Sequence, residues 1–316
     1  MAKSALITAT GRFILHFGDI LDSFFLTSLL SSIQIDELYH LAAQSHVGVS
    51  FSLAQYSSDV NALGTLRILQ AMLATGKHRN LKFYNACSSE VFGKVLERPQ
   101  NENTPFQPLS PYATAKAFGY WTTINMRHGY GLFASNGILF NHESPRRGLG
   151  FVTRKISYGV AAIRHGRSQT LLLGNLESRR DWGHARDYAE GIYQIMQLPE
   201  AADVILATGV THSVREFAEE VFLLAGIPIH WEGQGVNEVG KQNDGGQVRI
   251  RIDPQLYRPN EVEYLCGSPK KAQNLLGWYS KTSFKALVKE MFDADMELFN
   301  SMAKTKVRDN LGQAKL

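Results

Sequence analysis

The chain has 316 residues, a net charge of +4, 44% hydrophobic residues and 20% charged residues, the composition of an ordinary soluble globular protein. Its lysines and arginines are scattered, which argues against a nucleic-acid partner and suits an anionic small molecule better. It contains no apolar run long enough to cross a membrane and no signal-peptide plan at the N-terminus, and its two cysteines are too few for a disulfide framework. We therefore expect a cytoplasmic protein without a membrane partner.

The first half of the chain alternates short apolar runs with amphipathic stretches. Strands are expected at 5–8, 12–19, 37–43, 82–87 and 135–141, and helices at 22–33, 56–74 and 111–129. This alternation predicts an α/β fold with a Rossmann-like, doubly wound parallel sheet. Ligands of such sheets bind beyond the carboxyl ends of the strands, where His40, residues 88–90 and residues 141–142 are expected.

The character of the sequence changes near Pro145. Arginines and glycines cluster at 144–148 and 178–183, a glycine-rich stretch at 233–246 predicts a flexible loop or hairpin, and 253–263 is a candidate binding loop. Helices are expected at 268–276 and 283–299. We expect a cofactor-binding domain at 1–145, to which 181–213 contribute, and a smaller C-terminal substrate domain formed by 146–180 and 214–316.

The start of the chain departs from a nucleotide-binding sheet, which normally turns from its first strand through a glycine-rich loop into a helix. Here only Gly11 precedes the next apparent strand, although a parallel crossover needs at least about ten residues. Either the first two strands are not parallel neighbours, or a segment is missing from the sequence. We favour the missing segment, and this interpretation predicts a break in the chain near residues 9–12.

Tyr112 and Lys116 carry the strongest functional signal. Ser110 is a good helix N-cap and Pro111 suits the first helical position, so a helix starting there places Tyr112 and Lys116 one turn apart on one face. A phenol is a poor base at neutral pH, but a nearby ammonium favours its ionised form. The pair suits removal of a proton from a substrate hydroxyl while hydride leaves the same carbon. The alternative is two ordinary surface residues.

Further motifs lie along most of the chain, at 41–47, 88–93, 110–116, 136–148, 151–155, 173–175, 180–185 and 257–262. Together they resemble the GDP-mannose 4,6-dehydratases of the extended short-chain dehydrogenase/reductase superfamily. The run 136–148 is the most specific, because relatives that act on other sugar nucleotides usually differ there. The sequence departs from the family at its start, where it lacks the family's N-terminal cofactor segment. In the family this segment consists of a glycine-rich loop, a helix, a strand and an arginine-containing loop.

The resemblance implies conversion of GDP-mannose to GDP-4-keto-6-deoxymannose with NADP as cofactor, and assembly as a homodimer or homotetramer. Tyr112 would take the proton of the C4 hydroxyl, Lys116 would stabilise the phenolate and anchor the ribose, and Ser88 would hydrogen-bond the same oxygen. NADP would accept the hydride and return it to C6. Glu90 would remove the C5 proton and help to expel the C6 hydroxyl as water. Alternatively, Glu90 is a helix-start carboxylate and Ser88 caps a turn.

Other residues take roles by family position. Those implied at the cofactor are Asp19, Leu41, Ala43, Gln44, Tyr112, Lys116, Leu139, Asn141, His142 and Arg147. Those implied at the sugar nucleotide are Ser45, Asn141, Val152, Lys155, Gly174, Asn175, Arg180, Arg258 and Glu261. Arg180 and Arg258 are the diphosphate candidates because guanidinium groups pair with phosphate in a bidentate way, although arginine-rich loops are more often solvated. No ligand spacing supports a metal site.

Two other interpretations stay open. An epimerase, or a 4,6-dehydratase of another sugar nucleotide, would share Tyr-x-x-x-Lys, but epimerases usually lack a glutamate at the position of Glu90. A non-catalytic paralogue could have lost the cofactor loop. The presence of Ser88, Glu90, Tyr112 and Lys116 argues against a long-standing loss of activity.

Overall fold

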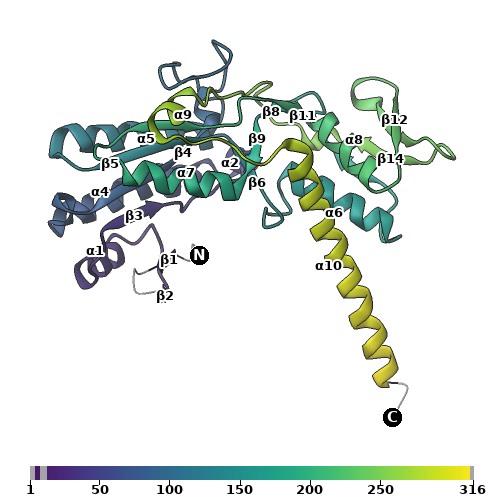
Figure 1. Cartoon of the computed structure of the whole chain (residues 1–316), viewed down its shortest axis with the longest axis horizontal. Helices are drawn as coiled ribbons and strands as arrows, with labels where there is room; N and C mark the ends of the chain where they lie inside the picture. Colours follow the sequence, from purple (N-terminus) through teal and green to yellow (C-terminus); the bar gives the residue numbers. More distant parts are fainter. Residues whose placement is uncertain (1–3, 8–12, 314–316) are drawn as a thin grey trace. The chain divides into compact units, whose positions relative to one another are not determined.

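The computed structural model describes residues 4–7 and 13–313 (Figure 1). The chain divides into two compact units. Unit 1 consists of 1–141, 186–209 and 265–279, and unit 2 consists of 142–185, 210–264 and 280–316. Each unit therefore takes in segments that are far apart in the sequence.

Unit 1 is built on a four-stranded parallel sheet, as the sequence predicts. In spatial order its strands are β10 (Asp203–Leu206), β5 (Ala134–Leu139), β4 (Lys82–Ser88) and β3 (Glu37–His40). His40 lies opposite Asn85, and Ser88 lies opposite Leu139. The carboxyl ends of β3, β4 and β5 therefore meet at one edge of the sheet, where ligand-binding residues are expected.

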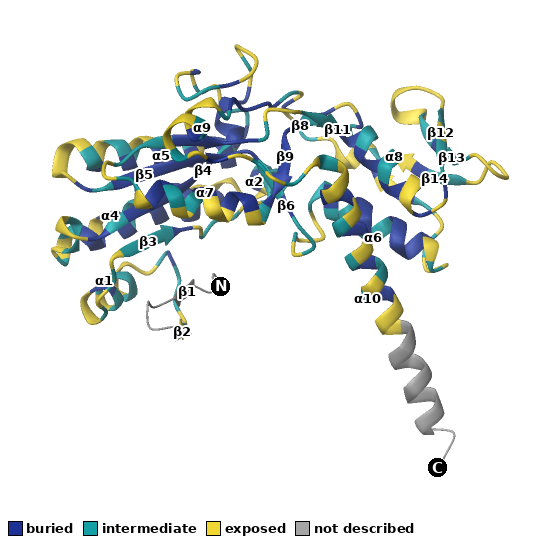
Figure 2. Ribbon diagram, viewed as in Figure 1, coloured by how far each residue is buried: buried dark blue, intermediate teal, exposed yellow. Residues whose placement is uncertain are grey.

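Helices cover both faces of this sheet, because its side chains alternate between two apolar layers. Phe83 joins a core shared with α1 (Ser23–Ser32), α4 (Gly64–Ala74) and α5 (Pro111–Tyr130). Tyr84 joins a second core shared with α7 (Ala185–Gln197) and α9 (Lys270–Leu276). Figure 2 shows the buried strands between these helices. The doubly wound arrangement is thus confirmed.

The helix expected at 56–74 contains an irregular turn. It consists of α3 (Ala54–Ser58), the π-helical segment η1 (Asp59–Leu63) and α4. π-turns are rare and often occur at functional sites. Ahead of it lies the short helix α2 (Val47–Ser52), which the sequence analysis did not anticipate.

The first two strands pair with each other and not with the parallel sheet. β1 (Ser4–Ile7) and β2 (Phe13–His16) are antiparallel, with Ser4 opposite His16. They are therefore not parallel neighbours, one of the two alternatives raised by the short connection between them. The expected break near residues 9–12 lies outside the described residues, so the idea of a missing segment stays a prediction.

Unit 2 combines a mixed sheet with three helices. The sheet order is β12 (Ile229–Glu232), β13 (Val239–Gln242), β14 (Val248–Ile252) and β7 (Leu171–Leu173), and only the β14–β7 pair is parallel. The glycine-rich stretch at 233–246 therefore contains β13 and the residues on either side of it that turn the chain back toward β12 and β14, including η4 (Gly235–Asn237). The helices α6 (Val152–Arg164), α8 (Val214–Leu224) and α10 (Phe284–Gln313) share one apolar core with this sheet.

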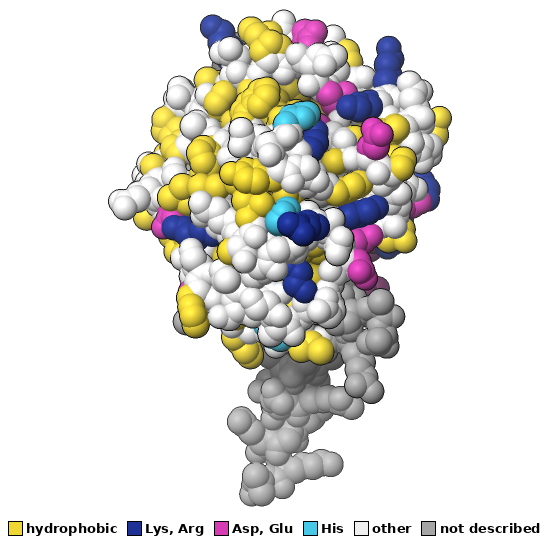
Figure 3. Space-filling view, turned by 90° about the vertical axis from the view of Figure 1, so that its left-hand side faces the viewer, with side chains coloured by type: hydrophobic (Ala, Val, Ile, Leu, Met, Phe, Trp, Pro, Cys, Tyr) yellow, Lys and Arg dark blue, Asp and Glu magenta, His cyan; other side chains and the backbone are white. Residues whose placement is uncertain are grey.

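Short elements complete the fold. Two small sheets pair β6 (Asn141–Glu143) with β9 (Trp182–His184) and β8 (Arg179–Arg180) with β11 (His212–Ser213). Besides η4, the 3-10 turns of the described residues are η2 (Lys77–Arg79), η3 (Ser89–Phe92) and η5 (Pro254–Leu256). Figure 3 shows acidic and basic side chains intermingled with apolar patches on one described face. Among the described residues, no helix is long and apolar enough to cross a membrane.

Candidate active site

The helix that carries Tyr112 and Lys116 begins where the sequence predicts. Ser110 Oγ accepts the Ala113 N–H at 3.1 Å, and Pro111 occupies the first helical position of α5. The helix ends at Tyr130, one residue beyond the predicted end, where Gly131 takes the left-handed conformation. Tyr112 and Lys116 are both buried, 7% and 5% exposed. A phenol and an ammonium thus lie one helical turn apart in the interior of unit 1.

The position of Lys116 is fixed by the sheet. Its Nζ donates a hydrogen bond of 2.8 Å to the carbonyl oxygen of Ala86, two residues before the end of β4. Burial lowers the pKa of Lys116 from 10.5 to about 8, because a buried ammonium loses its hydration. The group therefore still carries a positive charge at neutral pH, at the carboxyl end of the sheet.

His40, at the end of β3, differs from Lys116 in carrying no charge at neutral pH. Its Nε2 lies 3.0 Å from Thr65 Oγ1, and Thr65 Oγ1 donates to the Asn61 carbonyl oxygen at 3.0 Å. The Thr65 hydroxyl proton is thus donated to Asn61. The imidazole of His40 must therefore donate the hydrogen in its bond to Thr65. Burial, helped by the nearby charge of Lys116, lowers the pKa of His40 to about 3. His40 is therefore neutral at physiological pH.

Ser88 and Glu90 lie two positions apart, at the end of β4 and in the turn that follows it. Ser88 is the last residue of the strand and the N-cap of η3, and its Oγ accepts the Glu90 N–H at 3.3 Å. Glu90 is buried, with 6% of its surface exposed. The capping role foreseen as an alternative for Ser88 is thus present. A serine hydroxyl that accepts one hydrogen bond still has its own proton to donate, so capping leaves a second role open.

The segment after β3, predicted to line the cofactor groove, is clamped by Asn61. The Gln44 N–H donates to Asn61 Oδ1 at 2.8 Å, and Asn61 Nδ2 donates to the Gln44 carbonyl oxygen at 3.0 Å. Ser57 Oγ adds a 3.0 Å bond to Gln44 Oε1. Asn61 is buried in the π-turn η1. The sequence analysis missed Asn61, whose only signal was a polar residue in an apolar helical stretch.

The remaining predicted residues of unit 1 lie at the ends of strands. Leu41 is exposed, and Ala43 and Ser45 follow it along the segment after β3. Leu139 ends β5 and Asn141 begins β6. Asp19 follows β2, where its Oδ1 accepts the Leu21 N–H at 2.9 Å in the turn before α1.

Unit 2 brings two predicted diphosphate ligands together. Glu261 Oε1 lies 3.1 Å from Arg180 Nη2 and 3.6 Å from Arg258 Nη1. One carboxylate therefore lies between two guanidinium groups that are 78 positions apart in the sequence, from 180 to 258. Arg180 is buried, so its charge is shielded from solvent. Glu261, predicted at the guanosine ribose, is engaged with both arginines in this structure.

Other predicted substrate residues lie on neighbouring elements of unit 2. Burial lowers the pKa of Lys155 on α6, and the charge of Asp253 opposes this effect. Gly174 follows β7, and an added Cβ there would come within 3.0 Å of the Leu256 carbonyl oxygen. Asn175 Oδ1 accepts the Glu177 N–H at 2.9 Å, and Val152 packs against the core.

Arg147, predicted at the cofactor, is held by neighbours within unit 2. Its Nε lies 3.1 Å from Glu143 Oε2, and its guanidinium carbon lies 3.7 Å from the centre of the Phe151 ring. Thr153 Oγ1 donates to the same Glu143 oxygen at 2.7 Å. Burial raises the pKa of Glu143, while Arg147 and Thr153 oppose it. His142 precedes this group on β6, and the sequence analysis had given Glu143 no role.

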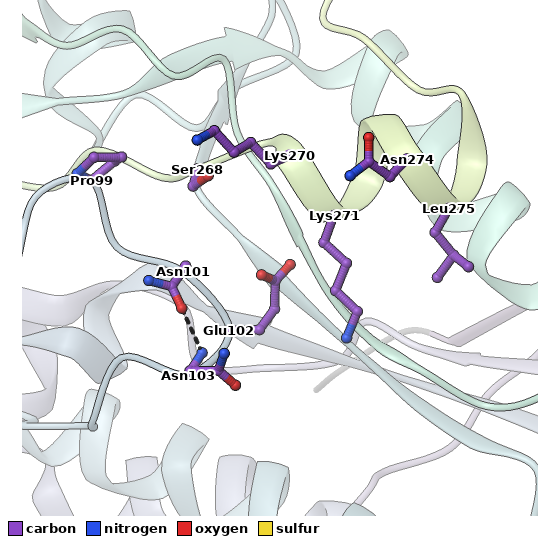
Figure 4. A pocket seen from close by; sticks show the side chains of 9 residues that line it. All are labelled: Pro99, Asn101, Glu102, Asn103, Ser268, Lys270, Lys271, Asn274 and Leu275. Carbon is purple, nitrogen blue, oxygen red and sulfur yellow. Dashed lines mark hydrogen bonds between the residues drawn. The ribbon is translucent and has the colours of Figure 1, made fainter.

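A surface hollow of about 750 Å³ in unit 1 is a different feature (Figure 4). It is lined by Pro99, Asn101, Glu102, Asn103, Ser268, Lys270, Lys271, Asn274 and Leu275. None of these residues belongs to the predicted site. Among the described residues, no three or more His, Cys, Asp or Glu side chains are grouped to hold a metal ion.

Two solved structures share the fold of this chain. RMD from Pseudomonas aeruginosa, complexed with NADPH, matches this chain with a TM-score of 0.74 at 23% identity. The match covers 89% of this chain and 88% of the RMD chain. DesIV, a dTDP-glucose 4,6-dehydratase from Streptomyces venezuelae with NAD and TYD bound, has a TM-score of 0.72 at 23% identity, with coverage of 89% and 78%. Both proteins therefore share the fold of this chain.

Sequence comparison identifies the family of the chain. The profile of the family described as GDP-mannose 4,6 dehydratase matches residues 2–291. The GDP-mannose 4,6 dehydratase of Drosophila melanogaster is 52% identical over 91% of this chain and 73% of its own length. The human enzyme is 50% identical over 92% and 78%, and that of Vibrio cholerae is 47% identical over 93% and 82%. The chain belongs to the GDP-mannose 4,6-dehydratase family.

Proposed function

We propose that the chain is an NADP-dependent lyase that converts GDP-mannose to GDP-4-keto-6-deoxymannose, the reaction of its family, through Ser88, Glu90, Tyr112 and Lys116. The observation that carries the proposal is the arrangement at the end of β4. Lys116 Nζ donates to the carbonyl oxygen of Ala86 on β4, Ser88 ends that strand, and Glu90 follows in η3. The phenol of Tyr112 lies one helical turn from Lys116, and the hydroxyl of Ser88 and the carboxylate of Glu90 belong to the end of the strand to which Lys116 is bonded. Such a set of groups can move protons at neighbouring carbons of a sugar.

Tyr112 is the group that takes the proton of the C4 hydroxyl. The positive charge of Lys116, one turn along α5, stabilises the phenolate that this transfer requires. The Ser88 hydroxyl donates its remaining hydrogen to the C4 oxygen and so fixes its position. His40 is neutral and adds no competing charge.

Glu90 is the group that acts at C5 and C6. A ketone at C4 acidifies the C5 proton, and the Glu90 carboxylate removes it. The same proton is then delivered to the departing C6 hydroxyl, which leaves as water. The backbone of Glu90 is held by its hydrogen bond to Ser88 Oγ. In this proposal the Ser88 hydroxyl therefore positions both the base Glu90 and the C4 oxygen of the substrate.

Unit 1 fits the nicotinamide half of the cofactor. The buried ammonium of Lys116 suits a ribose hydroxyl, and the clamped Gln44 backbone gives a rigid wall beside it. Other residues of unit 1 proposed to bind the cofactor are Asp19, Leu41, Ala43, Leu139 and Asn141. When bound, NADP supplies a hydride acceptor for C4 and a hydride donor for C6.

Unit 2 holds the sugar nucleotide in this proposal. Arg180 and Arg258 pair with the diphosphate, and Glu261 keeps both guanidinium groups in place beforehand. The close approach of Gly174 to Leu256 leaves room for backbone rather than side chain beside the ligand. Further contacts within unit 2 are proposed for Val152, Lys155 and Asn175.

A homodimer or homotetramer is proposed as the active form. Large apolar side chains are exposed on α3, η1 and α5, which contact one another: Tyr56, Leu63, Phe118 and Trp121, between 42% and 60% exposed. Such a patch marks an interaction surface. The cytoplasm is the proposed compartment, because Cys87 and Cys266 are both free and buried.

Replacing Glu90 by glutamine tests the mechanism. The amide keeps the size of the side chain but cannot accept the C5 proton, so solvent exchange at C5 in deuterium oxide and 6-deoxy product should both stop. Oxidation at C4 should continue, and reduced cofactor should accumulate on the protein, which absorbance near 340 nm detects. Normal exchange and product formation in Glu90→Gln would assign the elimination to another residue.

A further inference from the structure

We infer that Ser50 is a positioning residue that fixes Tyr112 for proton transfer, an inference that rests on the catalytic role proposed for Tyr112. Ser50 lies on α2, and its Oγ accepts the backbone N–H of Tyr112 at 3.2 Å. Both α2 and α5 belong to unit 1. The contact joins residues 62 positions apart.

The first turn of α5 shows why this bond matters. The N–H groups at the start of a helix have no partner within the helix. Pro111 has no N–H, and the Ala113 N–H is taken by Ser110 Oγ. The Tyr112 N–H is the remaining donor before the regular bond from the Thr114 N–H to the Ser110 carbonyl oxygen. Ser50 thus satisfies the backbone of the residue whose side chain does the chemistry.

The hydroxyl of Ser50 is itself held in one orientation. Ser50 is fully buried, and its Oγ donates to the Val47 carbonyl oxygen at 2.6 Å. With its only proton committed to Val47, the oxygen presents a lone pair to the Tyr112 N–H. Since water does not reach the residue, no solvent molecule replaces this acceptor when the hydroxyl is removed.

Through Ser50, the start of α5 is also tied to the proposed cofactor wall. Helix α2 begins at Val47, directly after the segment that contains Gln44, and His46 Nδ1 caps it by accepting the Val49 N–H at 3.2 Å. Gln44 in turn is clamped by Asn61. A movement of the segment that contains Gln44 is therefore transmitted to the backbone of Tyr112 through the hydrogen bond of Ser50.

The test compares two serines on the same helix. Ser52 Oγ donates to the Val49 carbonyl oxygen at 3.0 Å, the same i−3 pattern as in Ser50, but Ser52 is exposed. Ser50→Ala should lower kcat about 10- to 100-fold, the effect of a small misplacement of a reacting group, with KM for GDP-mannose little changed. Ser52→Ala should keep the wild-type kcat. Equal kcat values for the two variants would overturn the inference.

Two further variants separate positioning from a general loss of stability. Ser50→Cys keeps a weaker acceptor of similar size, so its kcat should fall between those of wild type and Ser50→Ala. Thr123→Val removes a buried hydroxyl from α5 itself, which donates within the helix to the Gly119 carbonyl oxygen. It should lower the melting temperature while leaving kcat and its pH profile unchanged. If kcat follows the melting temperature across these variants, Ser50 is merely structural.

Tyr112→Phe is measured in the same assay, so that the inference and the proposed function fail in different ways. Wild-type turnover in Tyr112→Phe would remove Tyr112 from the mechanism, and the inference would fall with it. Loss of turnover in Tyr112→Phe together with full turnover in Ser50→Ala would leave the proposed function intact and refute the positioning role alone.

Discussion

When the pH is raised, Lys116 should lose its proton at a much lower pH than an ordinary lysine does. The side chain is 5% exposed, and burial lowers its pKa from 10.5 to about 8. That difference corresponds to about 3 kcal/mol in favour of the neutral amine, at roughly 1.4 kcal/mol per pKa unit. About nine in ten molecules should be protonated at pH 7 and about one in ten at pH 9.

The sign of the effect on stability follows from the same values. The folded protein binds this proton less tightly than the unfolded chain does. The charge on Lys116 therefore destabilises the fold fully below about pH 8, and this cost disappears as the pH rises toward 10.5. With the catalytic role proposed for Lys116, an ammonium held at such a cost is a typical trade of stability for activity.

Competitive labelling of the ligand-free protein with trace acetic anhydride measures this pKa directly, because only neutral amines react. Mass spectrometry of the Lys116 peptide between pH 6 and pH 11 should show a half-maximal reactivity near pH 8. Lys285, whose side chain is 78% exposed, serves as the internal reference for the reagent. The midpoint is independent of how slowly a buried amine reacts. A midpoint for Lys116 at or above pH 10 would refute the argument from burial.

Three substitutions extend the account. Tyr112→Phe should lower turnover by about 10²–10⁴-fold with GDP-mannose binding retained, as steady-state kinetics and calorimetry would show, and unchanged turnover would contradict it. Asn61→Leu should raise the Kd of NADP at least about tenfold, because it removes both bonds to the Gln44 backbone and leaves buried groups unpaired; a wild-type Kd in a fluorescence titration would speak against the clamp. Arg180→Lys should raise KM for GDP-mannose more than it lowers kcat, since an ammonium cannot pair with phosphate in a bidentate way, and an unchanged KM would argue against diphosphate contact.

Much of unit 1 could be predicted because its signals are local. The alternation of apolar strands with amphipathic helices fixes a parallel sheet, and Ser110 with Pro111 fixes the start of α5. Tyr112 and Lys116 then fall on one face without any knowledge of tertiary contacts. The family motifs supplied the remaining roles, which neither periodicity nor spacing could assign.

What escaped prediction depends on contacts between distant residues. The bond between Ser50 and Tyr112 depends on how α2 packs against α5, and the pairing of Arg180 with Glu261 spans 81 positions. The π-turn that aims Asn61 at Gln44 leaves no recognisable mark in an otherwise regular helical pattern. The antiparallel pairing of β1 with β2 is likewise a choice of partner, which a strand's own sequence does not specify.

The most direct test of the central claim is a product assay with the purified chain. Incubation with GDP-mannose and NADP should yield GDP-4-keto-6-deoxymannose, seen by mass spectrometry as the loss of one water from the sugar nucleotide and by NMR as a C6 methyl group. NADP should be needed only in catalytic amount, because the hydride taken from C4 returns to C6. Unaltered GDP-mannose in the presence of saturating NADP, from a protein that is folded by circular dichroism, would contradict the claim.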